Sequence, residues 1–570
     1  MTQRNPYLVN KTFTSYLFVT ILASMALSLG VVLNGIIVGN LLGVNALSSI
    51  NLSAPLMQLF TALFLLINVG GAILVAKAIG QRKYEEVNRF FSLSMFLSVL
   101  VGLLVTIIGI FFLDEVVRLL CSNTELQTLV KEYVRVVLWS APVYLLLPGL
   151  CVYVRADGNP KLASVALIAA NLINVGLTLL FISIFSWGIL SASLATLIGY
   201  TIGIVIASSH FLKKDRMLHF VKPVLNKKTG ILLLNGLPLA IASTLMVIRL
   251  LSTNHIILSH LGIVGISILS VCFNLLMISN MFIVGTVQTM QPIASVLYGA
   301  EDFKGVRLAI LAALKTLAFC LFSLLLLLLL LPGLFTTLFG LSGTTLLIQA
   351  KVAIRLFALC LPFFGLNYLI MAVFQLSGRS NFSLIVSCTQ GLLVIPIMLA
   401  AAFLNNETLI WLSFVMGEVL VLGIIWIISR TVRRKQPQLA PITLISAPPS
   451  EEVILDFSIQ SSITKIKEFT ETIHHFLQEN NINTHSRNAI EICSEELIST
   501  IMNQGQSNKK TNYIDIRLNL KSHKAVLSIT DAGIPFDPVK YDTKCSNIHY
   551  SRTLNQNVVV VEFEIQKIIP

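Results

Sequence analysis

The stretch FTSYLFVTILASMALSLGVVLNGIIV, at positions 13–38, contains no acidic, basic or histidine side chain. A helix needs about 20 apolar residues to cross the hydrocarbon core of a bilayer, so this stretch is long enough to span a membrane. It is longer than the apolar part of a cleavable signal sequence, and no cleavage motif follows it. We therefore expect it to stay in the protein as the first membrane-spanning helix.

Similar apolar stretches recur along most of the chain. The 570 residues have a mean hydropathy of +0.83 and only 12% are charged, whereas soluble domains carry about 25% charged residues. The composition predicts an all-α polytopic membrane protein with 12 transmembrane helices, followed by a small α+β domain. The predicted spans are 13–38, 51–79, 92–114, 131–155, 161–186, 188–212, 237–261, 265–298, 307–335, 350–377, 381–404 and 408–431.

Lys and Arg are concentrated in alternate loops between these spans. Short cytoplasmic loops are enriched in both residues, so the bias predicts cytoplasmic N- and C-termini in a bacterial inner membrane, with the lipid bilayer as a partner. Topology also accounts for the net charge of +13, and nucleic acid is therefore not an expected partner. The loop cations that carry the bias include Lys77, Arg82, Lys83, Arg89, Arg155, Lys161, Lys213, Lys214, Arg216, Lys304, Arg307, Arg379, Arg430, Arg433 and Arg434.

The chain resembles itself at an offset of about 220 residues. Asn34-Gly-Ile-Ile-Val aligns with Asn254-His-Ile-Ile-Leu, and Gly80 and Gly158 align with Gly299 and Gly378. Two lobes of six helices, 1–220 and 221–435, would then insert in the same orientation. Parallel repeats of this kind are typical of transporters that rock around a central site.

Several motifs in order resemble the multidrug and toxin extrusion (MATE) family, over about residues 10 to 435. They are Gly35-Ile-Ile-Val-Gly39, Gly80, Arg155-Ala-Asp-Gly-Asn-Pro-Lys161, Met290-Gln-Pro292 and Gly299. The resemblance implies twelve helices in two lobes and export of organic cations or related drug-like amphiphiles. It also implies that an inward gradient of Na⁺ or H⁺ drives export, so the protein is expected to be an antiporter and not an enzyme.

The family places acids in the first lobe where this chain has neutral residues. The family's first-helix acid corresponds to Asn34, and its helix-5 pair corresponds to Asn174 and Thr178. Thr196 matches a family threonine on helix 6. Such a cluster can offer oxygen ligands to Na⁺ but cannot titrate a proton at physiological pH. It is either a cation or substrate site or ordinary helix–helix hydrogen bonding.

The second lobe has two charges near the middle of its spans. Arg249 lies in the seventh span and Glu418 in the twelfth, and their opposite signs predict a buried pair. Charges at this depth are costly and usually functional. Glu418 is either the carboxylate that responds to a cation or substrate, or half of a static ion pair.

A proline-rich linker, 436–452, is expected to be extended and semi-rigid, and to lead into a soluble domain, 453–570. Strands are predicted at 453–457, 513–520, 525–529 and 558–565, and helices at 461–478 and 486–502. All eight cysteines are expected to be reduced, because none forms a CxxC or CxxH spacing.

The C-terminal domain resembles the histidine-kinase-like ATPase fold of anti-sigma-factor kinases. The resemblance assigns Asp531 and Gly533 to the adenine-binding motif and Glu496 to the general base. Thr500 replaces the family's magnesium-binding Asn, and no glycine-rich phosphate box follows Pro538. Three roles remain open: a kinase, a nucleotide-binding module without catalysis, and a degenerate module that binds a cytoplasmic regulatory protein.

These observations predict a secondary efflux transporter with a regulatory tail and no metal site. The alternative is a transporter-derived membrane sensor that signals through the C-terminal domain. An ATP-driven pump is disfavoured because the chain has no GxxxxGK[ST] phosphate loop.

Overall fold

The computed structural model describes residues 4–121, 124–213, 216–338, 344–445, 452–460, 464–504, 513–535, 537, 538, 545 and 547–566. The chain forms two compact units. The membrane unit comprises Tyr16–Asp302 and Ala309–Ser446, and the terminal unit comprises Met1–Ser15, Phe303–Leu308 and Ala447–Pro570.

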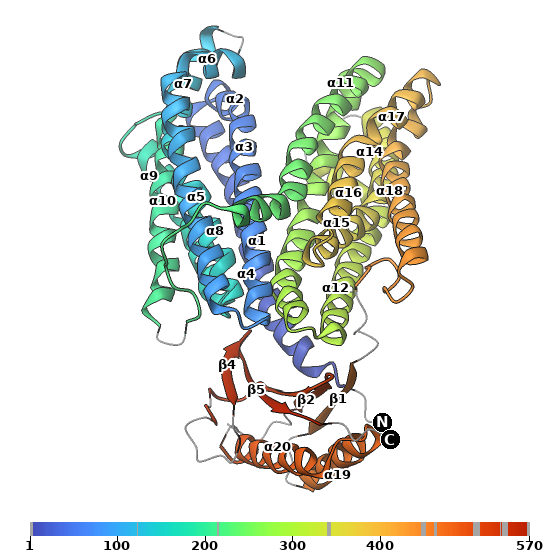
Figure 1. The fold of residues 1–570 in the computed structure, drawn as a ribbon. Coiled ribbons are helices and arrows are strands. Elements are labelled where there is room, and N and C mark those ends of the chain that lie inside the picture. Colours follow the sequence, from blue (N-terminus) through green and yellow to red (C-terminus); the bar gives the residue numbers. More distant parts are fainter. Residues whose placement is uncertain are drawn as a thin grey trace. The chain divides into compact units, whose positions relative to one another are not determined.

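The membrane unit is helical throughout its spans (Figure 1). In the described residues, eleven helices are long and apolar enough to cross a membrane, and the bent pair Leu126–Trp139 and Ala141–Ala156 makes a twelfth. This confirms the twelve predicted spans. The helices are α1 (Tyr7–Leu42), α2 (Val44–Leu52), α3 (Ala54–Phe64), a π-helical turn η1 (Leu65–Val69), α4 (Gly70–Gly80), α5 (Tyr84–Phe111), α6 (Leu113–Leu120), α7 (Thr124–Trp139), α8 (Ala141–Ala156), α9 (Pro160–Ser183), α10 (Leu190–Ser208), a 3₁₀ turn η2 (Ser209–Leu212), α11 (Lys227–Gly299), α12 (Phe303–Leu330), α13 (Pro332–Leu338), α14 (Thr344–Ala358), α15 (Cys360–Leu376), α16 (Ser380–Leu392), α17 (Val394–Phe403) and α18 (Glu407–Lys435).

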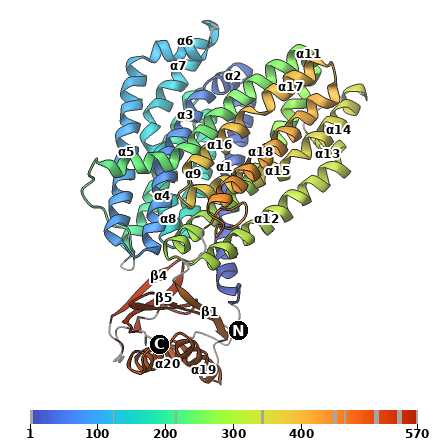
Figure 2. The ribbon, with the colours of Figure 1, turned by 45° about the vertical axis from the view of Figure 1, so that its right-hand side comes forward.

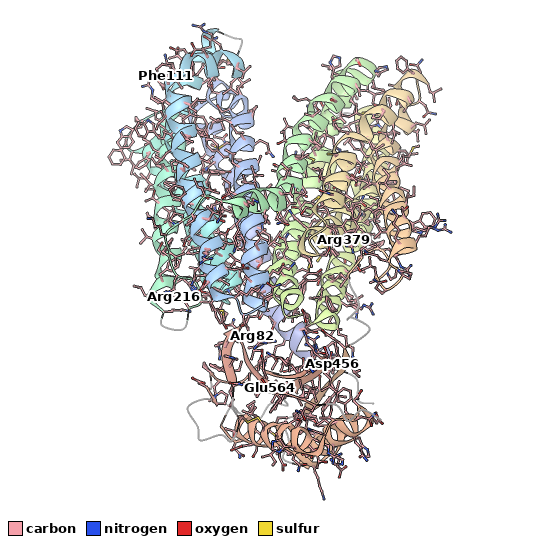
Figure 3. The ribbon with its side chains drawn as sticks, viewed as in Figure 1. Arg82, Phe111, Arg216, Arg379, Asp456 and Glu564 are labelled. Carbon is pink, nitrogen blue, oxygen red and sulfur yellow. A yellow bond between two sulfur atoms is a disulfide. The ribbon has the colours of Figure 1, made fainter. Side chains whose placement is uncertain are left out.

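Large apolar side chains cover the outer surface of these helices. Phe111 at the end of α5 is 79% exposed (Figure 3), and Phe319 on α12 is 76% exposed. Soluble proteins rarely leave so many large apolar groups in water. The pattern is that of helices whose outer faces contact lipid.

The internal repeat is visible in the backbone. Residues with a left-handed φ recur in pairs about 220 residues apart, and each pair lies at a corresponding break between helices. The pairs are Gly43 (φ 84°) with Gly262 (φ 62°), Arg82 (59°) with Glu301 (58°), Gly158 (84°) with Gly378 (76°), and Ser186 (55°) with Asn405 (49°). Gly262 also divides the long α11 into the seventh and eighth spans.

The two lobes meet where α4 and α11 cross (Figures 1 and 2). A Cβ on Gly80 would lie 1.9 Å from Val296 O, and a Cβ on Gly299 would lie 2.0 Å from Lys77 O. Only glycine fits at either position, because the backbones of the two helices touch there. The two glycines of the repeat therefore allow one close contact between the lobes.

The segment after α18 is not extended as the sequence suggested, at least as far as residue 445. Residues 436–445 turn back, Ile442 N donates to Ser429 Oγ at 2.9 Å, and Leu439 and Leu444 are buried. Burial of these two leucines offsets the left-handed φ of Ile442 and Leu444. The rest of the linker, 446–451, lies outside the described residues.

The terminal unit contains a five-stranded antiparallel sheet in the order β1-β2-β3-β5-β4. Apolar side chains from alternate strand positions pack with the two helices into one core, and Phe457, Phe469, Leu497 and Ile516 lie in it. The strand at 548–553 was not predicted from the sequence. The elements are β1 (Val453–Gln460), α19 (Thr464–Glu479), α20 (Thr484–Gln504), β2 (Tyr513–Leu520), β3 (Lys524–Asp531), β4 (Ile548–Thr553) and β5 (Gln556–Glu564).

Candidate functional site

The four polar residues predicted for the first lobe form one hydrogen-bonded network inside it. Asn34 on α1 donates through Nδ2 to Asn174 Oδ1 on α9 at 2.8 Å. Asn174 Nδ2 donates to Thr196 Oγ1 on α10 at 2.8 Å, and Thr178 Oγ1 donates to Asn174 Oδ1 at 3.4 Å. The network joins three helices and carries no charge.

One oxygen of this network lacks a donor. Asn34 Oδ1 is buried and receives no hydrogen bond from the described residues. A buried carbonyl oxygen without a donor is costly, and it is also a ligand of the type that hard cations prefer. The network therefore contains an amide oxygen without a donor and two hydroxyl groups, and no group that could titrate.

The second lobe brings Arg249 and Glu418 together. Arg249 Nη1 on α11 lies 2.9 Å from Glu418 Oε1 on α18, and each side chain is 2% exposed. The Arg249 guanidinium also lies over the ring of Phe414, 5.6 Å from its centroid. The carboxyl group and the guanidinium thus lie side by side deep inside the lobe.

Two further residues that the sequence did not single out complete this centre. Asn367 Nδ2 on α15 donates to Glu418 Oε2 at 2.9 Å, and Gln390 Nε2 on α16 donates to the same oxygen at 3.0 Å. Both are amides in otherwise apolar helices, and this pattern could have identified them as candidates in the sequence. Their contact with Glu418 could not be predicted, because they lie far from it along the chain. Together the four side chains hold one fixed ion pair with both carboxylate oxygens bonded.

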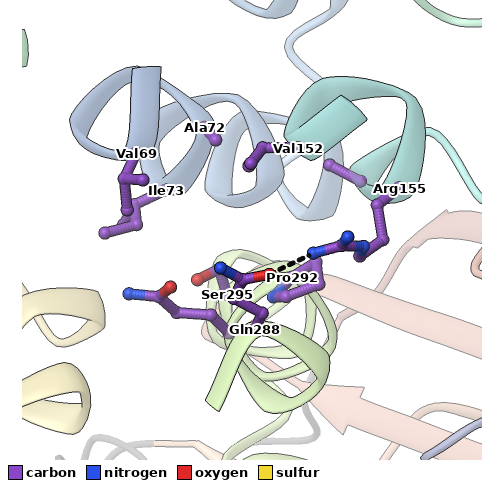
Figure 4. Close-up of a pocket in the computed structure, with 10 residues that line it drawn as sticks. Val69, Ala72, Ile73, Val152, Arg155, Gln288, Pro292 and Ser295 are labelled. Atoms are coloured by element: carbon purple, nitrogen blue, oxygen red, sulfur yellow. Dashed lines mark hydrogen bonds between the residues drawn. The ribbon is translucent and has the colours of Figure 1, made fainter. Parts of the chain in front are cut away.

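A small, partly open pocket lies between the lobes (Figure 4). Arg155 on α8 reaches toward Gln288 on α11, and Arg155 Nη1 donates to Gln288 Oε1 at 3.0 Å. The sequence placed Arg155 among the loop cations, but its side chain is 2% exposed. The lining residues are Val69, Ala72, Ile73, Val152, Arg155, Ala156, Gln288, Gln291, Pro292 and Ser295.

The loop after α8 is held by Asp157. Its Oδ2 lies 2.7 Å from His210 Nε2, and its carboxylate accepts hydrogen bonds from the backbone N–H groups of Met217 and Leu218. Gly158 then turns the chain with φ 84°. These contacts fix the end of α8 and so the position of Arg155.

In the terminal unit, Asp531 and Gly533 do lie together, but the carboxylate is already engaged. Asp531 Oδ1 accepts from Gly533 N at 2.7 Å and from Asn557 Nδ2 at 3.1 Å. Burial raises the pKa of Asp531, and these hydrogen bonds oppose that shift. The side chain that would hold an adenine amino group thus has internal partners.

The helix that carries Glu496 also has internal partners. Thr500 Oγ1, at the position of the family's magnesium-binding Asn, donates to Glu496 O at 2.7 Å. Cys493 on the same helix forms a disulfide with Cys545, with Cα atoms 5.3 Å apart. The expectation that every cysteine is reduced was therefore wrong for this pair, because folding brings together residues that lie 52 positions apart. Residues 539–544, where a phosphate box was sought, lie outside the described residues.

The face of the sheet away from α19 and α20 holds the first residues of the chain. Arg4 Nε lies 3.1 Å from Asp515 Oδ2, and Arg4 Nη1 lies 3.7 Å from Asp456 Oδ2. Asn5 N donates to Ser458 Oγ at 2.8 Å, and the rings of Tyr7 and Tyr513 are 5.2 Å apart. The start of α1 is thereby fixed to β1 and β2 by buried ion pairs.

Twelve apolar spans in two repeated lobes, with a buried polar centre in each lobe and a pocket between them, define a secondary membrane transporter. The MatE family matches residues 19–180 and 238–400, which is more than half of the chain and one match in each lobe. The chain therefore belongs to the MATE family and is an efflux transporter, not an enzyme.

Relatives and solved structures agree with this assignment. The chain is 23% identical over 396 residues to the multidrug export protein MepA of Staphylococcus aureus strain bovine RF122 / ET3-1, covering 68% of this chain and 86% of that protein. It is 22% identical over 394 residues to MepA of Staphylococcus haemolyticus strain JCSC1435, with the same coverage.

The fold matches that of solved transporters. A MOP superfamily transporter from Pyrococcus furiosus superposes with a TM-score of 0.69 at 21% identity, over 76% of this chain and 99% of that one. An outward-facing multidrug resistance MATE transporter gives the same score and identity, over 76% and 100% of the two chains.

Proposed function

We propose that this protein exports small amphiphilic molecules across a bacterial inner membrane by rocking its two lobes, and that both of its termini are cytoplasmic. Transport in this family is coupled to an ion gradient. The observation that carries the proposal is the pocket between the lobes, whose apolar wall and few polar groups are typical of a small-molecule site. The relatives named MepA are multidrug exporters, which supports the same class of substrate.

We place ion coupling at the two buried centres, and each favours a different ion. The first-lobe cluster of Asn34, Asn174, Thr178 and Thr196 offers neutral oxygens, which suit Na⁺. Glu418 is the one buried acid in the described membrane spans, so H⁺ coupling would act there. Release of Glu418 from Arg249 would be the step that a bound cation controls.

Reconstituted protein tests this proposal. Proteoliposomes that contain the full chain should move an amphiphilic dye when a Na⁺ gradient or a pH gradient is imposed. The gradient that works identifies the ion, and Asn34→Ala and Glu418→Gln should then differ in which of them abolishes transport. Absence of movement under both gradients, with folded protein and dyes of each charge, would contradict the exporter and favour the sensor alternative.

We infer a second role for the terminal unit, as a regulatory module that does not transfer phosphate. Asp531 is bonded to Asn557, Thr500 replaces the magnesium ligand, and Cys545 is tied to the helix of Glu496. The face of the sheet that contacts Arg4 attaches the module to the start of α1. Because α1 runs without a break from Tyr7 to Leu42 and carries Asn34, this helix links the module to the first-lobe cluster.

The contact between the sheet and Arg4 is directly testable. Arg4→Ala should raise hydrogen exchange in β1 and β2 and change the transport rate, because Asp456 and Asp515 lose a buried cation. Lys467→Ala on the exposed face of α19 is the matched control. If Arg4→Ala left the transport rate unchanged while exchange rose, the tail would be attached but not regulatory. ATP should change neither hydrogen exchange nor the transport rate. A clear response to ATP would instead support the hypothesis that the domain is a nucleotide-binding module.

A further inference from the structure

Arg155 is a buried charge without a counter-ion in the described part of the chain. Its side chain is 2% exposed, and its one hydrogen bond is the neutral contact with Gln288. The Nε atom is buried and finds no acceptor among the described residues, and no described carboxylate forms an ion pair with the guanidinium. Charges inside a membrane protein are costly unless they are paired, and they mark ligand sites.

The other polar groups of the pocket can also donate hydrogen bonds. Ser295 Oγ is buried and has no partner in the described residues. Gln288 and Gln291 add two side-chain amides, of which Gln291 Nε2 already donates one hydrogen bond to Gln375 Oε1 at 3.4 Å, and the remaining wall is aliphatic. No acidic side chain lines the pocket. A guanidinium, a hydroxyl and two amides thus surround a space whose other surfaces are apolar (Figure 4).

We propose that this pocket binds the anionic group of an amphiphilic substrate, with Arg155 as its counter-ion. The inference rests on the proposed export function and narrows its substrate class. A guanidinium pairs with carboxylate, sulfonate or phosphate through two parallel hydrogen bonds, and the aliphatic wall takes the hydrocarbon part. An organic cation, which the family resemblance implied, would meet an unpaired positive charge there.

Binding at Arg155 also has a consequence for the lobes. Arg155 belongs to the first lobe on α8, and Gln288 belongs to the second lobe on α11. An anion that takes the place of Gln288 at the guanidinium removes one hydrogen bond between the lobes. Substrate binding and separation of the lobes are therefore linked through the same side chain.

The internal repeat supplies a conservative substitution for the test. Gly158 corresponds to Gly378 in the backbone, and three residues before each lie Arg155 and Gln375. Gln375 is fully buried in the second lobe. Arg155→Gln therefore places in the first lobe the residue that the second lobe already accommodates, and it removes the charge without leaving a void.

The experiment uses three matched probes: naphthalene-1-sulfonate, its neutral sulfonamide and 1-naphthyltrimethylammonium. Binding to the full chain in a nonionic detergent is measured by calorimetry, and transport is measured in proteoliposomes. Arg155→Gln should weaken binding of the sulfonate on the order of tenfold, the usual effect of one charged hydrogen bond, and leave the sulfonamide unchanged. Arg155→Lys should retain part of the affinity. Arg379→Gln, a cation outside the pocket, should have no effect.

The possible results distinguish a failure of the anion site from a failure of the export function. If the wild-type protein binds the cation in preference to the sulfonate, or if Arg155→Gln weakens all three probes equally, the anion site is refuted while export can still stand. If the sulfonate binds through Arg155 but no gradient moves any probe, the site stands and the export function fails. Should Arg155→Gln not fold, Ser295→Ala gives the same test with an expected loss of about fivefold; an unchanged affinity there would refute the site.

Discussion

The two lobes share one backbone plan but place different chemistry at corresponding positions. At the offset of 219 residues that relates Gly43 to Gly262 and Ser186 to Asn405 in the backbone, Arg249 and Glu418 of the second lobe correspond to Gly30 and Gly199 of the first. A Cβ on Gly30 would lie 2.8 Å from Asn171 Oδ1, and one on Gly199 would lie 2.5 Å from Ala170 O. The first lobe thus packs its helices together where the second lobe contains an ion pair.

The difference shows that the two halves of a duplicated fold can carry different polar groups. The first lobe keeps a neutral cluster about one turn away from its glycines, centred on Asn174. The second lobe keeps a carboxylate that pairs with a guanidinium. Among the described spans, only the second of these two centres therefore contains an acidic side chain.

Removing the charge of Glu418 should have the largest effect. Glu418→Gln leaves Arg249 buried without a counter-ion, which costs about 3–5 kcal/mol, and it should abolish efflux that is driven by a pH gradient. The double variant Arg249→Met/Glu418→Gln makes the second lobe neutral like the first and should recover stability in thermal unfolding. If the double variant also recovers efflux, the pair is a static support and the two lobes differ in packing alone.

Filling a first-lobe glycine should come next. Gly199→Ala forces a methyl group against Ala170 O, and such overpacking costs about 1–3 kcal/mol. Gly176→Ala on α9 is the matched control because a Cβ there meets no atom within 4 Å; it should be neutral or slightly stabilising. Equal melting temperatures for the two variants would show that close packing does not explain the missing charges of the first lobe.

Introducing an acid tests the first lobe directly. Asn34→Asp restores to α1 the group that the family motif carries, and it places a carboxyl beside Asn174 Oδ1, where it can bind and release a proton. Transport should become more dependent on pH, with a stability loss of about 1–3 kcal/mol from the altered hydrogen bonds. Asn34→Ala, which removes the amide without adding an acid, is the control. A pH profile identical in both variants would mean that this position does not reach the coupling step.

The smallest effect should come from Asp531, a buried carboxylate that accepts hydrogen bonds from the neutral donors Gly533 and Asn557, whereas Glu418 also pairs with Arg249. Its pKa is raised by burial. The folded state then binds the proton more tightly than the unfolded state, so the contribution of this carboxyl group to stability is greatest below the ordinary pKa of 3.8. Stability falls as pH rises from there through the raised value.

The isosteric variant Asp531→Asn should remove this dependence. Hydrogen exchange of β3 in the full chain, followed from acid to neutral pH, measures the change. The slope of protection against pH should be negative in the wild-type protein and flatter in the variant. The same slope in both would mean that Asp531 is not the group that titrates.

The sequence by itself determined the parts of this protein that depend on local composition and period. Apolar length predicted the twelve spans, because a bilayer demands about 20 such residues in each helix. The recurrence of Gly80 at Gly299 predicted the two lobes, and opposite charges at one depth predicted the pairing of Arg249 with Glu418. Alternating residues likewise predicted β2 at its observed bounds.

The tertiary structure decided which distant groups meet. Asn367 and Gln390 reach Glu418 only because α15, α16 and α18 pack together. Arg155 has the form of a loop cation in the sequence, yet helix packing between the lobes buries it beside Gln288. Such contacts join residues far apart in the chain, and no period or spacing along the sequence records them.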